Sequence, residues 1–186
     1  MSEKIKSPLA EQVIPSPNYW KGRFRPVQFI TPHCTAFPCT VQELGELFAD
    51  PDRECSSNYG IGFDGKIAMY VEEGSRSFCS SSFANDGVAV TIECSSAAVP
   101  PYEMTEAVWR SLIALCVDIC RRYGKRRLVW IEDKATAFRY VPRKDELMLT
   151  IHRWFAKEKE CPGEWLYTRL GVLAQTVTEQ LNTETA

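Results

Sequence analysis

The chain has 186 residues, of which 45% are hydrophobic and 25% charged, and its formal net charge at pH 7 is −2. This length accommodates one domain with its own core, and the balance of residue types is that of a globular protein. The small negative charge, with no basic stripe interleaved with aromatic residues, argues against nucleic acid as a partner, and no run approaches the ~20 apolar residues of a membrane span.

The first half of the chain predicts an arm, a strand, a helix and a hairpin. Residues 1–18 contain three prolines and few periodic apolar positions, which indicates an irregular arm. Residues 26–31 predict a strand. The segment Thr40-Val-Gln-Glu43 has the pattern of a helix capping box, and apolar residues follow it at helical spacing. Residues 59–61 and 66–71 flank an Asp-Gly turn and predict a hairpin.

In the second half, residues 88–94 predict a buried strand and residues 105–123 a long amphipathic helix. Residues 128–131 predict a second strand, residues 132–149 a loop with some local structure, and the residues after Gly163 a final helix. Strands and helices therefore mix along the chain, without internal repeats. We expect an α/β fold in which residues 1–186 form a single domain, with a central mixed β-sheet flanked by helices.

Cysteine usage and the N-terminus bear on where the protein is made. The sequence has eight cysteines, and its first residues lack the apolar region of a secretion signal. We therefore expect reduced thiols and synthesis in a cytoplasm without a signal peptide.

Histidine is scarce, because His33 and His152 are the only two in the chain. The predicted strand at 26–31 delivers His33 at its C-terminal end, and one short segment contains His152, Lys159 and Cys161. Two histidines and a cysteine are an accepted ligand set for a catalytic zinc ion, which keeps a fourth position open. By spacing alone, packing or surface roles remain open, and Cys161 could equally be a buried small hydrophobe.

Several separated segments carry a more specific signal, namely Ser16–Arg23, Ile30–Thr35, Ser56–Lys66, Arg76–Ser82, Ala84–Asp86, Val90–Glu93, His152–Ala156 and Lys159–Gly163. In this order they resemble the type 2 N-acetylmuramoyl-L-alanine amidase family, which includes phage endolysins, animal peptidoglycan recognition proteins and bacterial muropeptide amidases. The resemblance spans residues 16–182, almost the whole chain.

The resemblance implies that His33, His152 and Cys161 bind Zn²⁺ in a groove at one edge of the sheet. Lys159 matches a family lysine that stabilises the developing oxyanion.

Two residues match groups that could activate the attacking water. Tyr59 matches a tyrosine that some members use at the active site, and Glu93 lies where other members place a proton-accepting carboxylate. The sequence leaves both candidates open, and each also has a structural interpretation: Tyr59 as a core aromatic and Glu93 as a polar group at a strand end.

The implied reaction is hydrolysis of the amide between N-acetylmuramic acid and L-alanine in peptidoglycan, giving an endolysin-like, bacteriolytic hydrolase that degrades the bacterial cell wall. We expect no wall-binding domain, and the segment 132–149 is longer than expected for related endolysins and could reshape substrate access. Two alternatives are a non-catalytic peptidoglycan-binding module and a thiol hydrolase in which Cys161 attacks.

Overall fold

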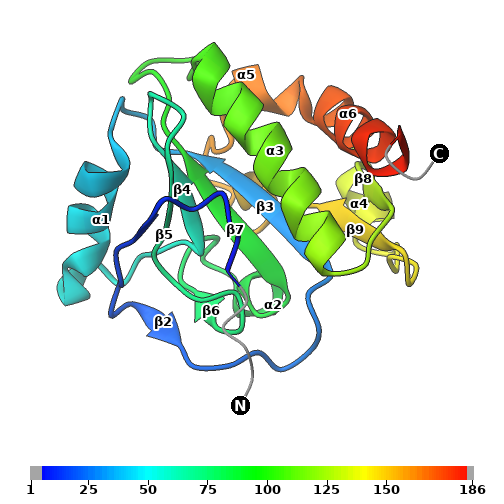
Figure 1. Ribbon diagram of the computed structural model, residues 1–186, viewed down its shortest axis with the longest axis horizontal. Helices are drawn as coiled ribbons and strands as arrows, with labels where there is room; N and C mark the ends of the chain where they lie inside the picture. The colour runs from blue at the N-terminus through cyan, green and yellow to red at the C-terminus, as the bar shows by residue number, and fades with distance from the viewer. Residues whose placement is uncertain (1–5, 184–186) are drawn as a thin grey trace.

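The computed structural model describes residues 6–183. A mixed β-sheet forms the centre of this fold (Figure 1). Within this range its seven strands lie in the order β1-β5-β4-β7-β3-β9-β8. Their bounds are Gln12–Val13 (β1), Phe29–Cys34 (β3), Tyr59–Ile61 (β4), Ile67–Met69 (β5), Ala89–Cys94 (β7), Arg127–Val129 (β8) and Glu146–Leu149 (β9). Among the neighbouring pairs of this sheet, β4 and β5 are antiparallel, and every other pair is parallel. The mixed sheet predicted from the sequence is thus confirmed.

A smaller sheet and two short segments complete the part of the fold that surrounds the central strands. In the small sheet, β2 (Tyr19–Trp20) pairs antiparallel with β6 (Arg76–Ser77). The 3₁₀ helices η1 and η2 span Pro51–Arg53 and His152–Trp154.

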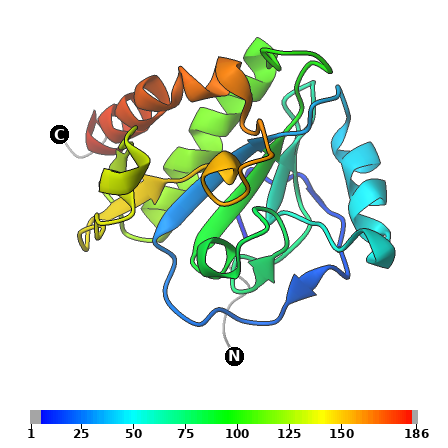
Figure 2. The same cartoon turned by 180° about the vertical axis from the view of Figure 1, so that it is seen from behind.

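Helices cover the central sheet unequally. Their bounds are Val41–Ala49 (α1), Phe83–Asp86 (α2), Glu106–Arg122 (α3), Lys134–Ala137 (α4), Gly163–Tyr167 (α5) and Leu170–Thr183 (α6). The long helices α3 and α6 lie against one face, and α1 flanks the sheet on the side of β4 (Figure 1). The opposite face carries α2 and the segment that follows β9, coloured orange in Figure 2. This second face is covered by short, irregular segments, which leaves room for a site.

The main core lies between the sheet and its long helices. Apolar side chains of α3 at helical spacing are completely buried, as are the alternate residues of β3 and β7 that face them, including Ile30, Val90, Ile92, Leu112 and Leu115. A smaller cluster under α1 contains Val41, Leu44 and Phe48. Within residues 6–183, no helix combines the length and the apolar character needed to cross a membrane.

Local signals in the sequence explain several boundaries. Thr40 caps α1, and its side chain and that of Glu43 form the predicted capping box. Thr105 caps α3, which ends before Gly124, a residue with φ of 64° that suits glycine. Gly65 closes the predicted hairpin turn with φ of 84°, where a Cβ atom would lie 3.0 Å from a backbone oxygen of α3.

The prediction for residues 132–149 was wrong in one main respect. This segment is not only a loop, because it contains the short helix α4 and the strand β9, which lies between β3 and β8. All four residues of β9 are buried, so the sequence shows no alternation between polar and apolar positions. Its first residue, Glu146, tolerates burial because it accepts hydrogen bonds from Tyr140 and the Arg143 amide.

Two smaller corrections concern the chain ends. Residues 12–13 of the arm predicted as irregular pair with β5 as strand β1, and residues 1–5 of that arm lie outside the described residues. The predicted final helix is divided into α5 and α6.

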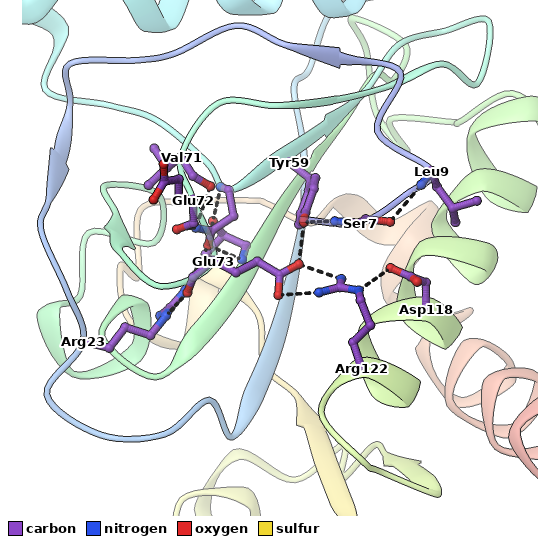
Figure 3. A network of polar contacts seen from close by, with 11 residues as sticks. Ser7, Leu9, Arg23, Tyr59, Val71, Glu72, Glu73, Asp118 and Arg122 are labelled. Atoms are coloured by element: carbon purple, nitrogen blue, oxygen red, sulfur yellow. Dashed lines mark hydrogen bonds and ion pairs between the residues drawn. The ribbon is translucent and has the colours of Figure 1, made fainter. Parts of the chain in front are cut away.

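A buried polar network joins the arm, the hairpin and α3 (Figure 3). The carboxylate of Glu73 is completely buried and pairs with Arg122 at 2.6 Å. Tyr59 donates a hydrogen bond to the same carboxylate and accepts one from the backbone N–H of Ser7 at 2.8 Å. Because each of these buried groups has a polar partner, the network links segments that are far apart in the sequence without leaving a charge unpaired.

Candidate metal centre

Strand register places His33 and Glu93 side by side. Each lies near the carboxyl end of its parallel strand, and the two residues are direct neighbours across β3 and β7. Side chains alternate along a strand, so both leave the sheet on the face opposite α3, whereas Cys94 points into the core on the other face. His33 is almost completely buried.

The segment after β9 brings the other two predicted ligands to the same point. His152 begins η2 rather than lying in a strand, and Cys161 follows nine residues later. One ligand atom each from His33, His152 and Cys161 lies within 4.8 Å of the other two. The Cys161 sulfur is 3.3 Å from Nδ1 of His33, and the two imidazole rings are 5.0 Å apart. The structure therefore brings the three predicted ligands together.

A hydrogen-bonded triad joins the two segments that carry the histidines. Thr31 and Thr150, each two residues before a histidine, are 2.7 Å apart through their hydroxyl oxygens. The side chain of Asn85 donates to Thr31 at 3.1 Å and accepts from Thr150 at 2.8 Å. All three side chains are buried, so these bonds fix the spacing between β3 and β9. Asn85 thus acts below the cluster and does not line the groove.

Burial keeps both imidazoles neutral. Desolvation lowers the pKa of His33 well below its ordinary value, and repulsion from His152 adds to the effect. Desolvation, together with the charge of Lys159, lowers the pKa of His152 to about 4. Burial also raises the pKa of the Cys161 thiol well above its ordinary value. Neutral imidazoles are the form that binds a metal ion, and a bound cation is what would favour the thiolate.

Glu93 lies against a cysteine that the sequence did not single out as functional. The sulfur of Cys79 donates to Oε2 of Glu93 at 3.7 Å, and His33, Cys79 and Glu93 form a second group of potential ligand atoms within 4.8 Å. Burial raises the pKa of Glu93 to about 8, although the hydrogen bond from Cys79 opposes the shift. A carboxyl group with a pKa near neutrality can both accept and release a proton.

These residues lie in an open groove of about 680 Å³. One wall is apolar and comes from α1, through Leu44, Leu47 and Phe48. The other wall is charged and includes the exposed side chain of Lys159. The groove is large enough for a small-molecule or peptide substrate. No described residue of the segment 132–149 lines it, so the structure gives no support to direct reshaping of the groove by that segment.

The structure does not bring Tyr59 to this cluster. Tyr59 pairs with Ile92 in β7, one position out of phase with Glu93, so its side chain leaves the sheet on the α3 face. It is completely buried, and its hydroxyl is engaged by Glu73 and Ser7 (Figure 3). Burial and the negative charge of Glu73 raise the pKa of Tyr59 far above its ordinary value. Of the two groups proposed to activate water, only Glu93 faces the groove.

Other groove residues escaped sequence analysis. Cys79 lies in the loop between β6 and α2, and Arg53 lies in η1 after α1; both line the groove. Neither stands at a spacing that identifies a site, and only the tertiary fold brings them to the groove that contains His33. The one available signal for Cys79 was its place in the segment Arg76–Ser82.

The donor set fits a zinc ion. Two neutral imidazoles and one thiol converge in a half-open position, which matches a catalytic His₂Cys site with an exchangeable fourth position. Nε2 of His33 is buried and has no hydrogen-bond partner among the described residues. A buried polar atom without a partner is costly, and a ligand outside the protein chain would satisfy the imidazole.

The structure is thus an α/β domain with a candidate His, His, Cys metal site in an open groove. The model of the family described as N-acetylmuramoyl-L-alanine amidase matches residues 23–164. The chain belongs to this amidase family. Comparison with curated protein sequences gives no match.

Solved structures of similar fold include AmpD, an endolysin and a peptidoglycan recognition protein. AmpD has a TM-score of 0.59 at 18% identity, over 90% of this chain and 95% of AmpD. A mutant endolysin from Bacillus subtilis has a TM-score of 0.56 at 14% identity, over 90% of this chain and 99% of the endolysin. Drosophila peptidoglycan recognition protein SA has a TM-score of 0.57 at 15% identity, over 84% of each chain. At these identities the likeness concerns the fold.

Proposed function

We propose that the protein is a zinc-dependent hydrolase of the bacterial cell wall that cleaves the amide between N-acetylmuramic acid and L-alanine. The observation that carries the proposal is the convergence of His33, His152 and Cys161 within 4.8 Å in an open groove. Membership of the amidase family supports the same activity. His33, His152 and Cys161 would hold the ion, which supplies a Lewis acid that polarises a carbonyl and lowers the pKa of water.

Glu93 is the proposed proton-transfer group. It faces the groove beside His33, and its carboxylate would accept a proton from water as the oxygen attacks the carbonyl carbon. The same proton would then pass to the amide nitrogen as the C–N bond breaks. The products would be a lactyl carboxylate on the glycan and a free amine on L-alanine.

Lys159 is the proposed oxyanion stabiliser. Its cation lies at the groove, close enough to His152 to depress the pKa of that imidazole. A positive charge there would favour the negatively charged tetrahedral state over the neutral amide.

Metal content and hydrolysis of a purified muropeptide test the proposal together. We expect about one zinc ion per chain, loss of stem-peptide release on chelation, and recovery on adding zinc. His33→Ala and His152→Ala should lose the metal and the activity together, because either change leaves two protein ligands. Full hydrolysis by metal-free protein would overturn the zinc mechanism. A zinc-loaded protein that binds the muropeptide without cutting it would instead be a peptidoglycan-binding module. The similarity in fold to a peptidoglycan recognition protein is the reason to test this alternative.

Substitution of the third ligand separates zinc hydrolysis from attack by a thiol. The 3.3 Å contact between Cys161 and His33 would also suit a cysteine nucleophile with a histidine base. A carboxylate binds zinc at ~2.0–2.2 Å, close to the ~2.3 Å of a thiolate, so Cys161→Asp should keep reduced, zinc-dependent activity. Cys161→Ala should lose the metal. Inactivation of both variants, with the wild type blocked by thiol alkylation while its zinc stays bound, would instead favour the thiol.

A further inference from the structure

An exposed aromatic surface lies outside the groove, around the small sheet of β2 and β6. Three of its rings are largely exposed: Trp20 at 63%, Phe24 at 50% and Phe83 at 55%. Phe24 and Phe83 stack with ring centres 5.2 Å apart and planes 9° from parallel. We call the surface formed by Trp20, Lys21, Phe24, Arg76 and Phe83 the aromatic patch; these residues surround a shallow hollow of about 180 Å³.

The aromatic patch is built rather than incidental. The guanidinium of Arg23 donates to the backbone oxygens of Glu73 at 2.5 Å and Asp86 at 2.8 Å, so it ties the segment before β3 to the hairpin and to α2. The ring of Phe24 packs against Gly87, where a Cβ atom would be 1.9 Å from it. Because the rings are already held in place, a ligand would lose little free energy in ordering them.

The charge of the patch has one sign. The described residues lining the hollow include Lys21, Arg23 and Arg76, and none of them is acidic. The guanidinium of Arg76 lies 4.5 Å from the ring centre of Phe83, and its Nε is buried without a hydrogen-bond partner. The chain as a whole carries a net charge of −2, so this local excess of positive charge is a property of the patch. The positive side chains favour an anionic ligand, and the exposed rings favour a ligand that also presents flat apolar faces.

The patch adjoins the candidate metal centre. Ser81 lies 3.5 Å from Nε2 of His152, and Phe83 follows Ser81 by two residues, at most ~7 Å along the chain. Figure 2 shows the small sheet and α2 on the face crossed by the orange segment after β9. A polymer whose reacting unit occupied the groove could therefore continue across the patch.

We propose that the aromatic patch binds the glycan strand of peptidoglycan next to the bond being cut. The proposal rests on the amidase function, because amide hydrolysis leaves a lactyl carboxylate on each muramic acid of the strand. The exposed rings suit the apolar faces of sugars, and Lys21 and Arg76 suit the carboxylates. The hollow is smaller than the ~300–1,000 Å³ of pockets that enclose a small ligand, as expected where one ring of a polymer lies across a surface.

Glycan strands already stripped of their peptides provide the test, because they contain no bond for an amidase to cut. The probe is a purified oligosaccharide of alternating N-acetylglucosamine and N-acetylmuramic acid, titrated calorimetrically into the zinc-loaded protein. We expect Trp20→Ala and Phe83→Ala each to weaken binding about threefold to tenfold, the range for loss of one aromatic contact. Phe63→Ala is the matched control, since Phe63 is 46% exposed but lies outside the patch. It should bind as the wild type does.

Charge recognition is tested with a neutral probe. Lys21→Ala should weaken binding of the acidic strand but leave binding of an oligosaccharide of N-acetylglucosamine alone unchanged. Unaltered strand binding by Trp20→Ala and Phe83→Ala would overturn the proposal. A second result would also overturn it: Trp20→Ala could lose self-association of the protein while it still binds the strand as the wild type does. That result would assign the patch to contact with a second copy of the chain. Because the probe requires no catalysis, strand binding by a protein without amidase activity would support the patch while refuting the proposed reaction.

Discussion

Glu93 and Tyr59 lie on neighbouring strands, yet their side chains leave the sheet on opposite faces. Glu93 is in register with His33 and faces the groove, whereas Tyr59 is in register with Ile92 and faces α3. Removal of one polar group from each residue should therefore affect different properties of the protein.

Glu93→Gln should keep the metal and the fold but lower turnover of a muropeptide by about 10²–10⁴-fold, the usual contribution of a positioned base. Tyr59→Phe should lower the stability of the fold and not the turnover. It removes the bonds to Glu73 and Ser7 and should lower the free energy of unfolding by about 1–3 kcal/mol, with turnover per folded molecule unchanged. Denaturant unfolding and steady-state rates on the same samples measure both effects. A stable Tyr59→Phe variant without activity would return the catalytic role to Tyr59.

The sequence predicted the positions of some site residues better than those of others. Two histidines and a cysteine are informative because so few chemistries use them, and the fold brings all three together. The role given to Tyr59 depended on strand phase, which a shift of one residue reverses and which the hairpin pattern does not fix. Cys79 stands among eight cysteines, and only its contact with Glu93 distinguishes it.

At the scale of elements, α4 supports the segment that carries His152. The ring of Phe138, just after α4, stacks on Phe155 at 5.6 Å and contacts Trp154 edge-on at 5.9 Å. The side chain of Lys134 donates to the backbone oxygen of Trp154. The segment 132–149 thus packs against η2, which begins at His152. Helices with caps and long periodic faces were predicted correctly, whereas β9 was not, because four buried residues show no period.

Phe138→Ala should loosen η2 and so weaken retention of zinc. Loss of these aromatic contacts should cost about 0.5–1.5 kcal/mol, or roughly two- to tenfold in metal affinity if the cost falls on the bound conformation. Competition with a chromogenic chelator measures the affinity. Val141→Ala is the control, because Val141 belongs to the same segment and is 77% exposed. Equal zinc affinities for the two variants would show that α4 does not support the centre.

At the scale of the whole molecule, the network around Glu73 connects three segments that the sequence presents separately. Glu73 follows the hairpin, Arg122 ends α3, and Arg23 belongs to the segment before β3 (Figure 3). The α/β class could be predicted from periodicity alone, since each element carries its own pattern. Nothing in the sequence around Glu73 indicates complete burial, because its partner is 49 residues away.

Arg122→Met tests how strongly the fold depends on this pairing. Methionine keeps an apolar stem but removes the guanidinium, which leaves the buried carboxylate of Glu73 without its cation. Loss of one partner of a buried pair typically costs about 3–5 kcal/mol, and for a chain of this size each kcal/mol lowers Tm by roughly 2–4 °C. Arg110→Met is the matched control on the same helix. Its pair with Glu106 has side chains 77% and 67% exposed, so we expect a loss below about 1 kcal/mol. Adding Glu73→Gln to Arg122→Met should restore part of the stability, because residue 73 then no longer carries a buried charge, although Asp118 still lacks its partner Arg122. If Arg122→Met and Arg110→Met had the same Tm in a thermal scan, the network would be solvated in solution and would contribute little to the stability of the fold.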